Sequence, residues 1–179
     1  MKSTEIYKIL NLYLKDEFKS LGYKKVKFCR LGWYKSIGNN FIIFEFQCNR
    51  WGWDYWTGTD FNFNFGCYDK ITELSWSVKP IVRLNEVIQY DDLFELVEIQ
   101  NSVISKFHSY DCDSKQAFPS AEPAFHDYLQ NQFKPILFPP SLTDMFHMRL
   151  YDENDVHKWG IYFQKIIKFI SNKLEILWN

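Results

Sequence analysis

The chain has 179 residues, a length typical of one domain, so we expect a single domain over residues 1–179. Its 21 basic and 22 acidic residues leave a net charge of −1, which excludes a global electrostatic attraction to nucleic acid or to an anionic membrane. Aromatic residues make up 20% of the chain, and because bulky rings favour pleated surfaces, this composition predicts a sheet with helices packed on it.

A helix is predicted from Ser3 to about Ser20, because apolar residues recur there at helical spacing. Gly22 follows where a left-handed cap would end such a helix. A first strand is predicted over about residues 25–31, and the polar, glycine-containing stretch 36–40 predicts a turn.

Two further strands show strict alternation of side chains. The first covers about residues 41–49 and the second about residues 61–68, where phenylalanines alternate with asparagines. A fourth strand is expected around residues 74–78. Because consecutive strands with short links usually pair antiparallel, we expect an antiparallel sheet of about four strands.

The second half of the chain changes to helical spacing. A helix is predicted from Asp91 or Asp92 to about residue 107, followed by a polar loop over 108–120 and a short helix beginning at Ser120. Residues 134–140 contain three prolines and are expected to be extended, and a long last helix is expected from about 152 to 177. The predicted fold is therefore α+β, with the sheet packed by N-terminal and C-terminal helices.

Residues 51–56 place four aromatic side chains in six residues where a turn is expected. Exposed Trp and Tyr rings can stack on sugars or bases, or anchor a protein partner. Alternatively, the same rings fold back and cover one end of the sheet, since large aromatic side chains are mostly buried in proteins. The candidate binding residues of this loop are Trp51, Trp53, Tyr55 and Trp56.

Asn62 and Asn64 alternate on the face opposite the phenylalanines of their strand. If that face is open, they line a polar groove together with Gln47 and Glu45 of the neighbouring strand; if a helix covers it, they need hydrogen-bond partners. The simpler interpretation of Glu45 is a position on the solvated face of the sheet.

No catalytic motif is present. The four histidines lie outside nucleophile or metal-binding motifs, and no glycine-rich phosphate loop occurs. The four cysteines contain no CxxC pair, so neither a metal nor another cofactor is expected. A hydrolase built on Glu45 and a histidine of the second half remains an alternative, and it requires both side chains in one pocket.

Four short segments carry a resemblance to a known family. They are Phe18-Lys-Ser-Leu-Gly-Tyr-Lys-Lys25, Phe44-Glu-Phe-Gln-Cys48, Phe61-Asn-Phe-Asn-Phe-Gly-Cys67 and Tyr151-Asp-Glu-Asn-Asp-Val-His-Lys-Trp159. Together they resemble the bacterial family called domain of unknown function 4304, over about half of the chain. The resemblance implies a compact α+β domain that is usually encoded alone, and it implies no activity.

We therefore expect a non-enzymatic protein-binding module, for which a toxin-neutralising immunity protein is one concrete form. The alternatives are a small-molecule or carbohydrate binder that uses the aromatic loop, and a hydrolase of unknown substrate.

The N-terminus lacks the apolar core of a signal peptide, and no apolar run reaches the ~20 residues of a membrane-spanning helix, so we expect a bacterial cytoplasmic location with reduced thiols. No nucleic-acid or membrane partner is predicted, and the sequence does not fix the oligomeric state.

Overall fold

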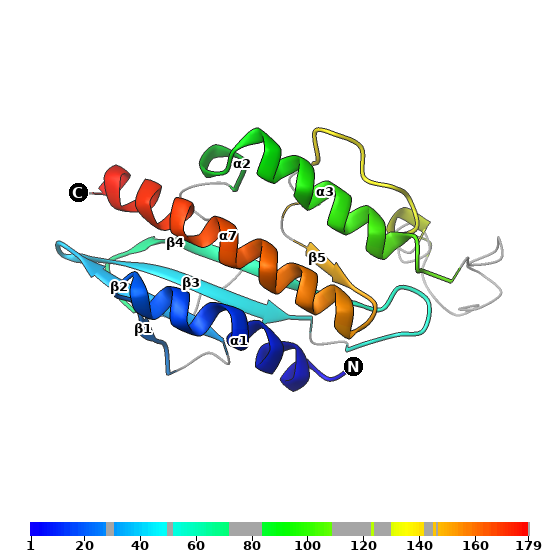
Figure 1. Cartoon of the computed structure of the whole chain (residues 1–179), viewed down its shortest axis with the longest axis horizontal. Coiled ribbons are helices and arrows are strands. Elements are labelled where there is room, and N and C mark those ends of the chain that lie inside the picture. The colour runs from blue at the N-terminus through cyan, green and yellow to red at the C-terminus, as the bar shows by residue number, and fades with distance from the viewer. Residues whose placement is uncertain are drawn as a thin grey trace.

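The structure is a computed structural model that describes residues 1–27, 31–49, 52–71, 84–108, 123, 130–141, 145 and 147–178. It is an α+β fold in which an antiparallel sheet of five strands is covered on one face by helices (Figure 1). The predicted fold class is therefore confirmed, with the N-terminal and C-terminal helices packed on the sheet, and these two helices also pack against each other.

The first helix, α1, spans Ser3–Ser20 as predicted. Its inward stripe consists of the buried side chains Ile6, Ile9, Leu10, Leu14 and Phe18. Gly22 follows with a φ of +83°, a conformation that glycine adopts without steric cost. The capping residue is Lys2, and its backbone N–H donates to Glu5 Oε2 at 2.7 Å.

The strands follow one another in the sheet in chain order. They are β1 Lys24–Lys25, β2 Gly32–Ile37, β3 Asn40–Cys48, β4 Thr59–Tyr68 and β5 His147–Leu150. Strands β2 and β3 are joined by a tight turn at Gly38 and Asn39, and Gly38 has the positive φ of +54° that two-residue hairpin turns require.

Two strand predictions differ from the structure. The strand expected over 25–31 is wrong in its described part, because β1 ends at Lys25 and the longer strand of this region, β2, begins at Gly32; residues 28–30 lie outside the described residues. The strand expected around 74–78 lies outside the described residues. Instead, β4 pairs on its other side with β5, which comes from the second half of the chain.

Three further helices have both ends in the described part of the chain: α2 Leu84–Val87, α3 Tyr90–Ile104 and α7 Glu153–Trp178. The last two confirm the helices predicted from 91 or 92 and from about 152. Residues 134–140 form neither helix nor strand, whereas most of the polar loop 108–120 and of the short helix after it lies outside the described residues. Among the described helices, none combines the length and the apolar character needed to cross a bilayer.

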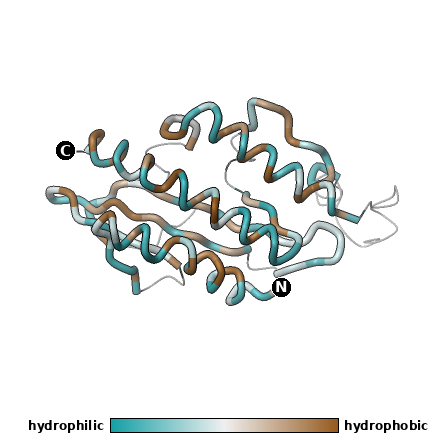
Figure 2. The backbone as a smooth tube through the Cα atoms, viewed as in Figure 1, coloured by the Kyte–Doolittle hydropathy of each residue, from teal (hydrophilic) through white to brown (hydrophobic). Residues whose placement is uncertain are grey.

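Helix α7 lies between α1 and α3 over one face of the sheet (Figure 1). Hydrophobic residues gather along the central strands beneath the helices (Figure 2). Aromatic rings fill this layer: Phe18 of α1 stacks on Trp33 of β2 at 4.3 Å between ring centroids, and Phe163 of α7 meets Phe46 of β3 edge to face at 5.1 Å. Part of the high aromatic content is thus explained by one buried cluster between sheet and helices.

Several large polar aromatic side chains of this core have hydrogen-bond partners. Trp159 Nε1 donates to the Arg149 carbonyl at 2.9 Å, and the Tyr162 hydroxyl donates to the Asp92 carbonyl at 3.0 Å. The Tyr23 hydroxyl lies 2.9 Å from Ser171 Oγ, and burial raises the pKa of Tyr23. Satisfied hydrogen bonds allow these large polar aromatics to be buried at low cost.

The β5 edge of the sheet is covered by a glutamine. Gln100, a fully buried residue of α3, donates through Nε2 to the His147 carbonyl at 2.6 Å and accepts the Arg149 N–H through Oε1 at 2.9 Å. Its carboxamide thus binds a donor and an acceptor of β5, as the backbone of a sixth strand would. At the other edge, β1 is short and carries two exposed lysines, which disfavours pairing with another chain there.

Candidate functional site

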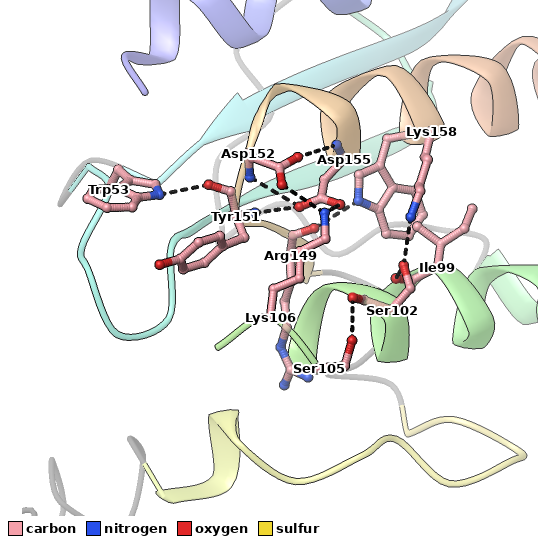
Figure 3. A network of polar contacts seen from close by, with 11 residues as sticks. Trp53, Ile99, Ser102, Ser105, Lys106, Arg149, Tyr151, Asp152, Asp155 and Lys158 are labelled. Carbon is pink, nitrogen blue, oxygen red and sulfur yellow. Dashed lines mark hydrogen bonds and ion pairs between the residues drawn. The ribbon is translucent and has the colours of Figure 1, made fainter. Parts of the chain in front are cut away.

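The aromatic loop lies between β3 and β4 at one end of the sheet. It meets the end of α3 and the start of α7 there (Figure 3). Trp51 lies outside the described residues, whereas Trp53, Tyr55 and Trp56 are described.

The backbone of this loop is held by one carboxylate. Asp54 Oδ1 accepts the N–H groups of Trp56 and Thr57, both at 2.7 Å, and Oδ2 accepts the Thr57 hydroxyl at 2.8 Å. Asp54 and Gly58 also exchange two backbone hydrogen bonds, of 2.7 and 3.0 Å. This arrangement closes a tight turn that presents Tyr55 at its tip.

Gly58 brings the loop into close contact with the end of strand β5. Its φ is +71°, and a Cβ atom at this position would lie 2.1 Å from the Leu150 carbonyl oxygen. Glycine is therefore required twice, by the backbone conformation and by the close approach to the end of β5. The loop consequently has a fixed position relative to the residue that follows β5, Tyr151.

Two aromatic side chains of the loop are both exposed and held in place. Trp53 is 38% exposed, and its Nε1 donates to the Tyr151 carbonyl at 2.9 Å (Figure 3). Tyr55 is 54% exposed and stacks on His108, with 4.1 Å between centroids and 6° between planes, while its carbonyl accepts the Tyr151 hydroxyl at 3.1 Å. We call Trp53, Tyr55, His108 and Tyr151 the aromatic surface. Trp56 is half-buried and contacts Tyr55 edge to face.

Neither sequence-based alternative describes this loop fully. Trp53 and Tyr55 pack against the end of the sheet through Tyr151, as the covering role required, yet both retain a large exposed fraction, as the binding role required. The loop therefore combines support from below with an accessible aromatic face.

A charge network built around one buried carboxylate supports the aromatic surface from beneath. Asp155, fully buried near the start of α7, accepts the N–H groups of Tyr151 at 2.9 Å and Asp152 at 3.1 Å through Oδ2 (Figure 3). Lys106, just beyond the end of α3, donates to Asp155 Oδ1 at 2.5 Å and to Asp152 Oδ2 at 2.9 Å. Because Asp155 fixes the backbone of Tyr151, the same carboxylate fixes the carbonyl that receives Trp53.

The pKa shifts of Lys106 and Asp152 agree with this geometry. Desolvation opposes the charge on Lys106, but hydrogen bonds from its ammonium to Asp155 and Asp152 outweigh it and raise the pKa of Lys106. Desolvation likewise opposes the charge on Asp152, yet the bond from Lys106 and backbone donors lower the pKa of Asp152. The ion pairs thus hold both groups in their charged forms.

The polar residues predicted on β3 and β4 do share one face of the sheet, opposite the helices. The register pairs Glu45 with Asn64 and Gln47 with Asn62. The interpretation of Glu45 as solvated is wrong, because only 6% of it is exposed, and Asn62 is 7% exposed; Asn64 is half-buried and Gln47 exposed. Alternation along a strand identifies the two faces, but it does not tell whether the second face is covered.

Two further residues of this face lie outside the polar groove predicted from the sequence. Asp60 of β4 and His147 of β5 lie beside Asn62, with 3.8 Å between His147 Nδ1 and Asp60 Oδ2. Asn62 Oδ1 is buried and accepts no hydrogen bond. Further along β4, the Tyr68 ring lies over Gly66, and burial, followed by the charges of Cys67 and Glu45, raises the pKa of Tyr68 to about 12.

The predicted site residues therefore form two groups. Trp53 and Tyr55 gather around Tyr151 and His108, whereas Asn62 lies four residues beyond Gly58 along β4, a rise of roughly 13 Å. Glu45 and His147 share the polar face but are separated by β4, a backbone spacing of roughly 10 Å for two strand intervals. Within the described part of the chain, no three His, Cys, Asp or Glu side chains are placed to hold a metal ion.

Comparisons with known proteins identify no relative of this chain. No family model, no curated protein and no solved structure matches the chain. The resemblance to the domain of unknown function 4304 family accordingly stays a prediction from its four short segments.

Proposed function

We propose that this protein is a non-enzymatic protein-binding module of the bacterial cytoplasm, and that it contacts its partner through the aromatic surface. The observation that carries the proposal is the exposure of Trp53 and Tyr55 combined with their fixed geometry. Aromatic anchors of this kind dominate the binding energy of protein interfaces, and an anchor held in its bound conformation loses little entropy on binding.

The chemistry of Trp53 favours an apolar contact. Its single polar atom, Nε1, is already bonded to the Tyr151 carbonyl, so a partner meets only the apolar ring. Tyr55 is likewise positioned through its carbonyl and its stacking on His108. Both rings therefore offer surface area without side-chain reorganisation, as the central residues of a protein interface do.

The proposal is tested with Trp53→Ala and Tyr55→Ala. Tagged wild-type protein is used to capture a partner from native cells, and the purified partner is then titrated by calorimetry against each variant. Loss of a central aromatic anchor is expected to weaken binding by about thirtyfold, which corresponds to ~2 kcal/mol.

The matched control is Leu137→Ala. Leu137 is apolar and 81% exposed, and it adjoins Phe138, which contacts Tyr90 at the start of α3 rather than His108 beyond its end. It should leave the affinity unchanged. Equal affinity of wild type, Trp53→Ala and Tyr55→Ala for every captured protein would refute the proposal.

A small-molecule or carbohydrate binder is the second candidate, and the orphaned acceptor Asn62 Oδ1 favours it. A buried carbonyl oxygen without a donor costs free energy that a bound donor would recover. A panel of metabolites and sugars, screened by thermal shift, should then contain a ligand that stabilises the wild type and not Asn62→Leu. A ligand that stabilises both equally would place the site elsewhere.

A further inference from the structure

The aromatic surface is flanked by an excess of negative charge. Asp54 supports the turn at its tip, and Asp152 and Asp155 lie directly beneath Tyr151. Asp152 and Asp155 share the ammonium of Lys106, and Asp54 adds a third carboxylate in the loop, so these four side chains together carry a formal charge of −2. Glu153, exposed in the first turn of α7, adds another carboxylate at the same end of the molecule.

The negative field reaches the aromatic rings themselves. Desolvation raises the pKa of the Tyr151 hydroxyl, and the neighbouring groups of Tyr55, Asp54 and Asp152 raise it further. Desolvation disfavours any charge at this hydroxyl, whereas the nearby carboxylates of Asp54 and Asp152 add a negative potential that attracts a cation. The faces of the Trp and Tyr rings are negative as well, because of their quadrupoles.

Resting on the function proposed above, we propose that the partner presents a cationic segment, with an Arg or Lys side chain lying against Trp53 and Tyr55 and near Asp54 and Asp152. An aromatic face with a carboxylate rim attracts such a side chain by cation–π contact and by Coulomb attraction together. Arginine suits the surface better than lysine, because its planar guanidinium stacks on rings and is more weakly hydrated.

The test uses short Gly-Arg repeat peptides with blocked termini as the probe, and Gly-Gln peptides of equal length as the neutral control. Binding is measured by titration, with tryptophan emission and protein NMR shifts as readouts. The Gly-Arg peptide should perturb Trp53 and Tyr55, and raising the salt from about 0.05 M to about 0.5 M should weaken its binding severalfold. The Gly-Gln peptide should produce no response.

Two charge-neutralising variants locate the effect. Asp54→Asn keeps the Oδ1 acceptor for the N–H groups of Trp56 and Thr57, and Asp152→Asn keeps the Oδ1 acceptor for the N–H of Asp155. Each should weaken binding of the Gly-Arg peptide by about twofold to fivefold. Tyr55→Ala should weaken it by at least about threefold through loss of the cation–π contact.

The outcomes separate this inference from the function on which it rests. If a captured partner needs Trp53 and Tyr55 but the Gly-Arg peptide does not bind, the inference is overturned and the binding function stands. If the peptide binds wild type, Asp54→Asn, Asp152→Asn and Tyr55→Ala equally, the cationic contact is not at this surface and the inference is again overturned. Failure of the function itself would show only as a captured partner that binds wild type, Trp53→Ala and Tyr55→Ala with equal affinity.

Discussion

Replacing Lys106 with methionine is expected to lower the free energy of unfolding by about 3–5 kcal/mol, because it leaves the buried carboxylate of Asp155 without a counter-ion. Lys106 Nζ lies 2.5 Å from Asp155 Oδ1, and the Asp155 side chain is fully buried. Methionine preserves the apolar stem of lysine, so the loss is mainly electrostatic. Urea unfolding followed by circular dichroism measures the difference.

The dependence of this loss on pH distinguishes a charge effect from a packing effect. In the wild type, the pKa of Asp152 is lowered, so its stabilising contribution is complete above the pKa of the unfolded chain and disappears as pH falls through the folded value. The pKa of Lys106 is raised, so its contribution disappears only as pH rises through a value above 10.5. The deficit of Lys106→Met should therefore be constant near neutrality and shrink below about pH 4.

Asp152→Asn is the matched control for the same network. Its side chain is 43% exposed, and asparagine retains the acceptor for the N–H of Asp155. Removal of this more exposed charge is expected to cost only about 0–1 kcal/mol. A deficit of Lys106→Met that is equally small, or that persists unchanged in acid, would contradict the assigned role of the buried pair.

The elements with a long, regular pattern could be predicted from the sequence. Helix α1 and helix α7 show an apolar stripe over many turns, and β3 and β4 alternate over most of their length. Such patterns are decided locally, by the period at which side chains face the core. The sequence also predicted that Glu45 and Asn64 share one face of neighbouring strands, and the register of the sheet then pairs them directly.

The strand β5 could not be predicted because its structure is decided by distant residues. It has only four residues, His147–Leu150, and it pairs with β4 on one side and with the Gln100 side chain on the other. Four residues are too few to show a period, so only the partner strand and helix α3 determine their conformation. The first predicted strand was placed too early in the chain, at 25–31 instead of at β2. Residues 25–31 carry residue types that also suit a strand, so residue type alone did not locate it.

Part of the candidate site could be predicted from the sequence. Trp53 and Tyr55 were identified because aromatic residues crowd one turn, but their supports, Tyr151 and His108, lie far away in the chain. The hydrogen bond from Trp53 to Tyr151 spans 98 positions. No local pattern encodes such a contact, so the sequence could not decide between an exposed and a folded-back loop.

Trp159→Ala is expected to lower the free energy of unfolding by about 3–5 kcal/mol, because it empties a large site at the centre of the aromatic cluster. The Trp159 ring is fully buried and contacts Phe61 of β4 and Phe163 of its own helix, with centroid distances of 6.2 and 5.8 Å. Its Nε1 also donates to the Arg149 carbonyl of β5. One side chain therefore joins α7 to two strands.

Comparison with Trp159→Phe and Trp53→Ala tests the distinction between core and surface tryptophans. Trp159→Phe retains a ring but loses the donor to Arg149, so it is expected to cost about 1–3 kcal/mol. Trp53→Ala removes a side chain that is 38% exposed and outside the cluster, so it is expected to cost no more than about 1 kcal/mol. If urea unfolding showed Trp53→Ala to be as damaging as Trp159→Ala, the aromatic loop would belong to the folding core, and its loss of binding would then report unfolding rather than recognition. A clear difference between the two variants instead assigns Trp159 to stability and leaves Trp53 free to serve binding.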